Sequence, residues 1–215
     1  MTLRIAIAAL ALALSAAGPA AAAPPTGILS CSVWSSRSTS YPPGFRFLPS
    51  LTEDPRLVKF DGTNDGGSSC DTSGVTGGRA PIETVTFKFT ARMSAGTCAA
   101  LTSGTPPFEN ARLKLTWRGV NAAGRSVKVG SSNTRIASAS YDTVSHTLTL
   151  TTQPLTGSAF KGRTVTVALG YYVGGLNGDD LLSFLEAGCP GGSGFVAMAF
   201  GMISGVGNPA TLVID

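Results

Sequence analysis

Alternation between apolar and polar residues is the clearest pattern in this chain. It covers residues 84–92, TVTFKFTAR, and residues 112–118, RLKLTWR. In both runs every second residue is apolar, and the residues between are threonine, lysine or arginine. Because successive side chains of a strand point to opposite faces, this period predicts two antiparallel strands, each with one buried and one solvent-facing side.

Further runs also predict strands, and the one at residues 195–203 is apolar enough to be buried on both faces. They cover residues 29–34, 56–60, 126–129, 135–141, 144–151, 163–172, 195–203 and 210–214. Between them lie stretches rich in Gly, Asn, Asp and Ser, which are residues that favour turns. Short strands with such punctuation predict an all-β fold, a single antiparallel β-sandwich or barrel-like domain.

Two segments do not follow the strand pattern. Residues 35–50, rich in Pro, Ser and aromatic residues, have no period and predict an ordered loop. Residues 179–187, DDLLSFLEA, fit a short helix, because acidic residues open the segment and its leucines form a stripe. They fit a strand almost as well, so at most one short helix is expected.

The N-terminus has the features of an export signal. Arg4 supplies a positive charge, residues 5–14 an apolar stretch, and residues 20–23 a run of alanines suited to cleavage. The apolar stretch is too short to span a bilayer. We therefore expect residues 1–22 to be a signal peptide and residues 23–215 to form one secreted or cell-surface domain without a transmembrane segment.

Four cysteines follow the predicted signal peptide: Cys31, Cys70, Cys98 and Cys189. In an oxidising compartment an even number of cysteines predicts two disulfides. Of the three connectivities that four cysteines allow, we favour Cys31–Cys70, which joins neighbours along the chain. The second bond is then Cys98–Cys189, which would tie the loop after a central strand to the C-terminal region.

The cysteines and the short motifs around them form a pattern. A Cys in the first strand, another after a Gly-rich turn and a third past an alternating strand are followed by further motifs. These are Thr-Trp at 116–117, a Thr-Gly segment over 156–165 and Cys-Pro-Gly-Gly at 189–192. The pattern resembles small secreted four-cysteine β-proteins of high-GC Gram-positive bacteria. The resemblance implies a compact disulfide-bonded β fold, and no activity or catalytic residue.

His146 is the only histidine, on the apolar face of the strand expected at 144–151. A Ser-His-Asp site would need it as the base, but no Gly-x-Ser-x-Gly motif supplies a nucleophile. One histidine and cysteines without Cys-x-x-Cys spacing do not assemble the usual zinc site. We predict a packed histidine, with no catalytic residue, metal or cofactor.

Acidic residues offer further candidates. Four oxygen-bearing residues surround a Gly-rich turn and could bind Ca²⁺: Asp61, Asn64, Asp65 and Asp71. They lack the spacing of a calcium loop, so we predict that they serve the turn, and that Asp179 and Asp180 serve a helix start. A hydrolase could draw a carboxylate pair from Glu53, Asp54, Glu83, Glu109 and Glu186, but their context singles out no pair.

Two sets of side chains could form a binding surface. The first is a cluster of aromatic residues interleaved with Arg37 and Arg46, namely Trp34, Tyr41, Phe45 and Phe47. Such rings stack on sugars, but they also plug the ends of β-domains, and we favour the plug.

The second set lies on the outward side of the two clearest strands. If residues 84–92 and 112–118 pair as neighbours, five cations share one solvent-facing surface: Lys88, Arg92, Arg112, Lys114 and Arg118. Because like charges directly opposite each other are unfavourable, we expect the register to stagger them. A solvated face that protects a sheet edge is the preferred interpretation, and an anion-binding patch is the alternative.

The overall charge is only mildly basic. The net charge of +4 falls to +3 without Arg4, because 15 basic residues then face 12 acidic ones. This balance, without any Lys/Arg-rich run, does not predict a nucleic-acid partner. The leading interpretation is an exported non-enzymatic domain with an envelope or extracellular ligand-binding or structural role, whose partner is an anionic envelope polymer or glycan. The alternatives are an envelope-polymer hydrolase using unidentified carboxylates and a carbohydrate-binding module using the N-terminal aromatics.

Overall fold

The computed structural model describes residues 22–34, 45–48, 53–63, 67–101, 103–142, 144, 147–169, 197–198 and 210–215. Several predictions fall outside this part of the chain. They concern the signal peptide up to residue 21, the segment 179–187, His146 and the Cys98–Cys189 disulfide.

The described residues are mostly β-strand, with turns and loops between the strands. The strands are β1 (Thr26–Gly27), β2 (Leu29–Trp34), β3 (Phe45–Leu48), β4 (Arg56–Thr63), β5 (Gly67–Asp71), β6 (Val75–Thr76), β7 (Ile82–Gly96), β8 (Glu109–Val120), β9 (Ser126–Asp142), β10 (Thr147–Thr152), β11 (Thr156–Gly157), β12 (Val165–Leu169), β13 (Ala197–Met198) and β14 (Ala210–Ile214). One helical turn, α1 (Cys98–Leu101), follows β7. The all-β prediction is therefore confirmed.

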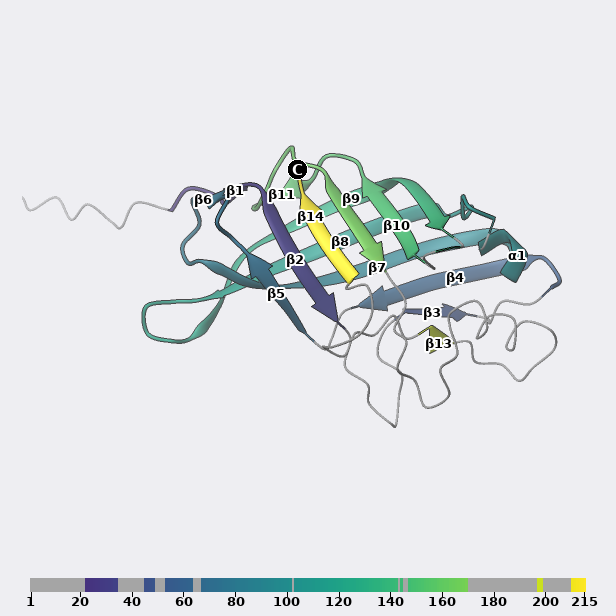
Figure 1. Ribbon diagram of the computed structural model, residues 1–215, viewed down its shortest axis with the longest axis horizontal. Coiled ribbons are helices and arrows are strands. Elements are labelled where there is room, and N and C mark those ends of the chain that lie inside the picture. The colour runs from purple at the N-terminus through teal and green to yellow at the C-terminus, as the bar shows by residue number, and fades with distance from the viewer. Residues whose placement is uncertain are drawn as a thin grey trace, which may run out of the picture.

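Most strands belong to one antiparallel sheet. Its order is β13-β3-β4-β7-β8-β9-β10-β12-β14-β2-β5, with β11 added beside β9, while β1 and β6 form a separate pair. Figure 1 shows this sheet curling into a half-barrel, with β2 and β14 lying across β7 and β8. A single curled sheet corresponds to the barrel-like form of the prediction.

The curl brings β5, at one end of the strand order, against β7. The Ser68 hydroxyl accepts a hydrogen bond from the Val85 backbone N–H at 2.6 Å and donates one to the Val85 carbonyl at 3.0 Å. Farther along β7, the Thr63 hydroxyl donates to the Phe87 carbonyl at 2.8 Å. These side-chain hydrogen bonds satisfy backbone groups of β7 near and beyond the point where its pairing with β4 ends.

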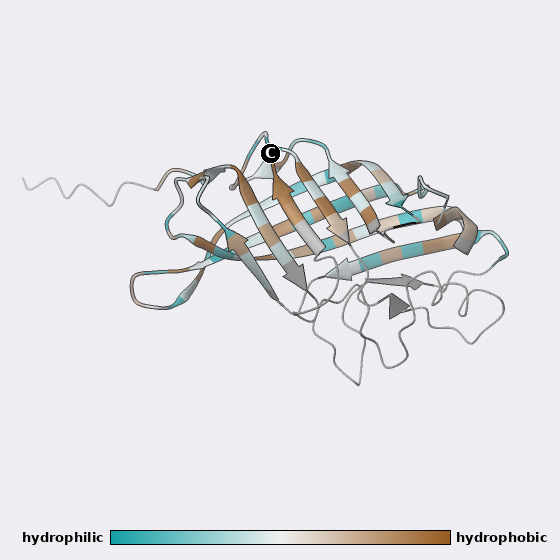
Figure 2. Ribbon diagram, viewed as in Figure 1, coloured by the Kyte–Doolittle hydropathy of each residue, from teal (hydrophilic) through white to brown (hydrophobic). Residues whose placement is uncertain are grey.

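Figure 2 shows hydrophobic and hydrophilic residues alternating in bands along the strands. The apolar residues of this alternation form the buried core. The inward residues of the two predicted strands are all buried: Val85, Phe87, Phe89, Ala91, Leu113, Leu115 and Trp117. The Trp117 indole N–H donates to the Ser132 hydroxyl at 2.9 Å, and that hydroxyl donates to the Ala159 carbonyl at 2.6 Å. The ring of Phe160 meets Trp117 edge-on at 4.9 Å. The buried polar groups of this region are thus satisfied.

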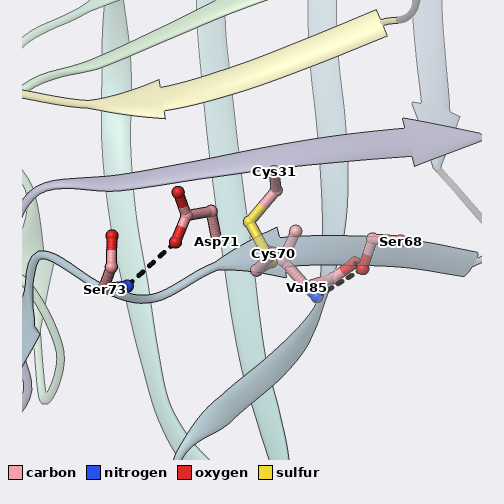
Figure 3. The surroundings of a disulfide bond; sticks show 6 residues. All are labelled: Cys31, Ser68, Cys70, Asp71, Ser73 and Val85. Carbon is pink, nitrogen blue, oxygen red and sulfur yellow. Dashed lines mark hydrogen bonds between the residues drawn. A yellow bond between two sulfur atoms is a disulfide. The ribbon is translucent and has the colours of Figure 1, made fainter.

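A disulfide joins Cys31 and Cys70, which lie directly opposite each other in β2 and β5 (Figure 3). Their Cα atoms are 4.0 Å apart, and Cys31 is buried. The predicted first connectivity is therefore confirmed. The segment around Cys70, which was not among the predicted strands, is strand β5.

Strand β9 corrects the prediction of two strands at 126–129 and 135–141. Residues 130–134, GSSNT, were expected to contain a turn, but they pair with β8, and an extra residue, Val129, is accommodated by a bulge opposite the step from Trp117 to Arg118. Gly130 serves packing here, because a Cβ atom at this position would lie 2.8 Å from the Cβ of Ala159.

Other boundaries also extend beyond the alternating runs. Strand β4 continues through Thr63, past the predicted end at residue 60, and residues 45–48 of the predicted loop form β3. The helical turn α1 lies in the predicted loop around residue 98, where the Thr97 side chain caps the Ala100 backbone N–H at 3.0 Å. Within the described ranges, no helix has the length and apolar content needed to cross a membrane.

Candidate functional site

Strands β7 and β8 pair as neighbours and present the five predicted cations on one side of the sheet. Lys88, Arg92, Arg112, Lys114 and Arg118 are all exposed, and the residues between them along each strand point into the core or are threonines. The expectation of a staggered register is wrong, since Lys88 lies directly opposite Lys114. Register follows the apolar residues, because a shift of one position would turn the core side chains outward.

The flanking strands add three exposed cations that the sequence did not identify. Lys59 of β4 lies opposite Arg92. On the other side, β9 places Arg135 opposite Arg112 and Lys128 opposite Arg118. We call the resulting surface the basic face, and its residues are Lys59, Lys88, Arg92, Arg112, Lys114, Arg118, Lys128 and Arg135.

The basic face is broad and carries little acid. It extends about 26 Å along β7, from Thr84 to Arg92, and about 14 Å across four strands at the usual strand spacings. The acidic side chains paired into this surface are Asp61, opposite Thr90, and Glu109, opposite Arg92. Glu109 also accepts a hydrogen bond from the Ser94 hydroxyl.

Edge protection does not account for these cations. Lysine on a strand blocks unwanted pairing when the strand is at the edge of a sheet. Strand β7, however, lies between β4 and β8, and β8 lies between β7 and β9. The cations on β7 and β8 therefore occupy central strands, where the interpretation preferred from sequence does not apply.

Four cross-strand positions set two cations directly against each other. They are Lys59 with Arg92, Lys88 with Lys114, Arg112 with Arg135, and Arg118 with Lys128. Opposite-charge pairs in these positions stabilise a sheet by roughly 0.2–1 kcal/mol, and like charges destabilise it. The fold therefore carries an electrostatic cost that is concentrated on one surface.

The acidic turn is not assembled as a cation site in the part of the chain that the structure describes. Asp61 lies within β4, whereas Asp71 lies in β5 and accepts a hydrogen bond from the Ser73 backbone N–H at 3.0 Å (Figure 3). Hydrogen bonds from the Ser73 backbone and side chain lower the pKa of Asp71. Asn64 and Asp65 lie outside the described residues, and among those described no group of three or more His, Cys, Asp or Glu is placed to hold a metal.

The candidate carboxylates include one pair that the fold separates. Glu83 lies on β7, nine positions from Arg92, the residue opposite Glu109. At roughly 3.3 Å per residue, Glu83 and Glu109 are therefore about 30 Å apart along the strands. The two carboxylates of a glycosidase lie within about 10 Å of each other. Glu53 and Asp54 precede β4, and Glu186 and Asp179–Asp180 lie outside the described residues.

The aromatic cluster is distributed over two strands. Trp34 ends β2, which pairs with β14 and β5, whereas Phe45 and Phe47 belong to β3, which pairs with β4 and β13. Tyr41 and Arg37 lie outside the described residues. The strand pairing therefore does not place Trp34 beside Phe45 or Phe47.

Comparisons of this chain with protein-family models, with curated proteins and with solved structures found no match.

Proposed function

We propose that this protein is an exported, non-enzymatic β-domain that binds an anionic polymer of the cell envelope or its surroundings through the basic face. The observation that carries the proposal is the set of four like-charged pairs across neighbouring strands. Repulsion between these pairs costs stability, and it is relieved when an anion lies between the charges. Binding of a polyanion therefore stabilises this surface more than it would stabilise an equal number of scattered cations.

The geometry favours an extended ligand. An exposed ion pair contributes roughly 0.2–1 kcal/mol in water, so a single anionic group would bind weakly. Eight cations on a rigid sheet can contact several charges of one polymer, and linking these contacts in one chain raises their combined affinity. The sheet fixes the backbone positions of these cations before binding, so only their side chains lose entropy when a polymer binds.

The experiment is salt elution from immobilised polyphosphate and polygalacturonate. The wild-type domain is compared with the variant Arg112→Ser/Lys114→Ser/Arg118→Ser. Its matched control is Arg125→Ser/Lys161→Ser/Arg163→Ser, which removes three exposed cations from connecting segments. Both variants lose the same net charge, but only the first alters the basic face.

We expect the wild type and the control to elute at similar salt concentrations and the basic-face variant to elute much earlier. Binding should weaken as the screening length falls from about 10 Å at 0.1 M to about 3 Å at 1 M salt. Equal elution of the two triple variants would mean that net charge alone causes retention. That result, or no retention of the wild type on either polymer, would overturn the proposal.

A further inference from the structure

A pocket opens where β8 separates from β9, at the border of the basic face. The ladder between the two strands ends at Arg112 and Arg135. The next backbone hydrogen bond between the segments joins the Tyr141 N–H to the Gly104 carbonyl at 2.8 Å. Residues 136–140 of β9 therefore have no ladder partner in β8, although most of them pair with β10 on the other side.

Local sequence explains this separation. Asn110 has a φ of +51° and lies at an irregularity in the pairing of β7 with β8. Asparagine tolerates this left-handed conformation better than most residues. Pro106 and Pro107 precede it and have no backbone N–H with which to continue a ladder. The result is a pocket of about 360 Å³, which is large enough for a small ligand.

The pocket combines one cation with neutral polar groups and an apolar wall. Arg135, Asn110, Ser138 and Gln153 are the polar residues that line it, and Phe108 lines the same space. Gln153 is anchored through its backbone, because its N–H donates to the Arg135 carbonyl at 2.9 Å and its carbonyl accepts from the Thr134 hydroxyl at 2.6 Å.

The ring of Phe108 packs against two other aromatic rings. Its ring stacks on Phe60 with 5.3 Å between centroids and 12° between planes, and it meets Phe89 edge-on at 5.7 Å. A ring fixed in this way, next to two prolines, offers a firm apolar wall to the C–H groups of a ligand.

This set of groups matches an acidic sugar. A guanidinium holds a carboxylate through two parallel hydrogen bonds, and side-chain amides both donate to and accept from hydroxyls. We propose that the pocket binds one carboxylate-bearing sugar unit of the anionic polymer, with the carboxylate on Arg135 and the hydroxyls on Asn110 and Gln153. This inference rests on the proposed function and adds selectivity to it, since the basic face by itself would attract any polyanion.

The test uses trigalacturonate and tripolyphosphate as soluble probes, with affinities measured by calorimetry at 0.15 M NaCl. In Asn110→Gly/Gln153→Ala, glycine accepts the positive φ of residue 110, and residue 153 keeps its backbone hydrogen bonds. Arg135→Lys keeps the charge of the basic face but removes the guanidinium fork. Asn133→Ser is the control, because residue 133 is exposed on β9 but does not line the pocket.

We expect the wild type and Asn133→Ser to bind trigalacturonate more tightly than tripolyphosphate. Each lost hydrogen bond should weaken trigalacturonate binding by about fivefold, since a net hydrogen bond contributes about 1 kcal/mol. Asn110→Gly/Gln153→Ala should keep the wild-type affinity for tripolyphosphate, because it alters no charged residue. Arg135→Lys changes a residue of the basic face, so its readout is the loss of trigalacturonate affinity. Equal trigalacturonate affinities in the wild type and the double variant would overturn the pocket assignment alone, whereas the proposed function fails if the wild type is not retained by either immobilised polymer.

Discussion

Replacement of Lys114 by Glu should stabilise the fold while it weakens polyanion binding. Lys114 is exposed and lies directly opposite Lys88 on neighbouring central strands. Two unit charges about 6 Å apart in water repel by about 0.7 kcal/mol, and charge reversal turns this repulsion into an attraction of similar size. After partial screening we expect a gain of about 1 kcal/mol, within the range of cross-strand pairs.

Thermal unfolding at low salt measures this gain. A change of 1 kcal/mol shifts Tm by about 2–4 °C in a domain of this size. Lys161→Glu is the control, because it changes the net charge equally at an exposed turn. Lys88→Glu in the Lys114→Glu background places two carboxylates opposite each other and should cancel the gain. The same Lys114→Glu protein should elute from polyphosphate at a lower salt concentration than the wild type.

The reasoning is refuted if Lys114→Glu raises Tm no more than Lys161→Glu does. It is also refuted if the gain persists in 1 M NaCl, where the screening length is about 3 Å and charges at this distance interact weakly. The first result would mean that the charges on the basic face are too well solvated for their pairing to matter. The second would mean that the gain in stability does not come from charge.

Two further predictions concern the core and a titrating group. Ser132→Ala removes the hydrogen-bond partner of the fully buried Trp117 indole and should lower the free energy of unfolding by about 1–3 kcal/mol in denaturant titrations. Ser138→Ala, an exposed position on the same strand, should be close to neutral, and equal losses in the two variants would contradict this role of Ser132. The pKa of Asp71 is lowered by its hydrogen bonds from Ser73, so the stabilisation from this carboxylate is present above its unfolded-state pKa and is lost as the pH falls through the lower folded-state pKa. A carboxyl NMR titration should find the pKa of Asp71 below its ordinary value and show it rise in Ser73→Ala, and no difference between the two proteins would exclude a contribution from the Ser73 side chain.

The sequence alone determined the strands with strict alternation and the side of each that faces the core. Residues 84–92 and 112–118 could be assigned because each buried side chain is followed by a threonine or a cation, which is a local property of the chain. The same alternation predicted that Lys88, Arg112 and Lys114 point outward. The Cys31–Cys70 bond could also be predicted from the sequence, since it joins cysteines that are neighbours along the chain.

Only the tertiary structure determined which strands are neighbours and how they align. Lys59, Lys128 and Arg135 join the basic face because β4 and β9 flank β7 and β8, and sequence order does not reveal this arrangement. The alignment of Lys88 with Lys114 follows from the burial of many apolar side chains, whose combined free energy exceeds the repulsion of one exposed pair.

Glycine and serine were the main source of wrong boundaries. Gly130 lies within β9 because Ala159 packs against it, and the Gly- and Ser-rich β5 is a strand because Cys70 bonds to Cys31 and Ser68 to Val85. In turns the same residues are favoured for backbone freedom and local hydrogen bonds. A small residue in the sequence is therefore equally consistent with a turn and with a closely packed strand. The residue that packs against it decides between the two, and that residue lies far away in the sequence.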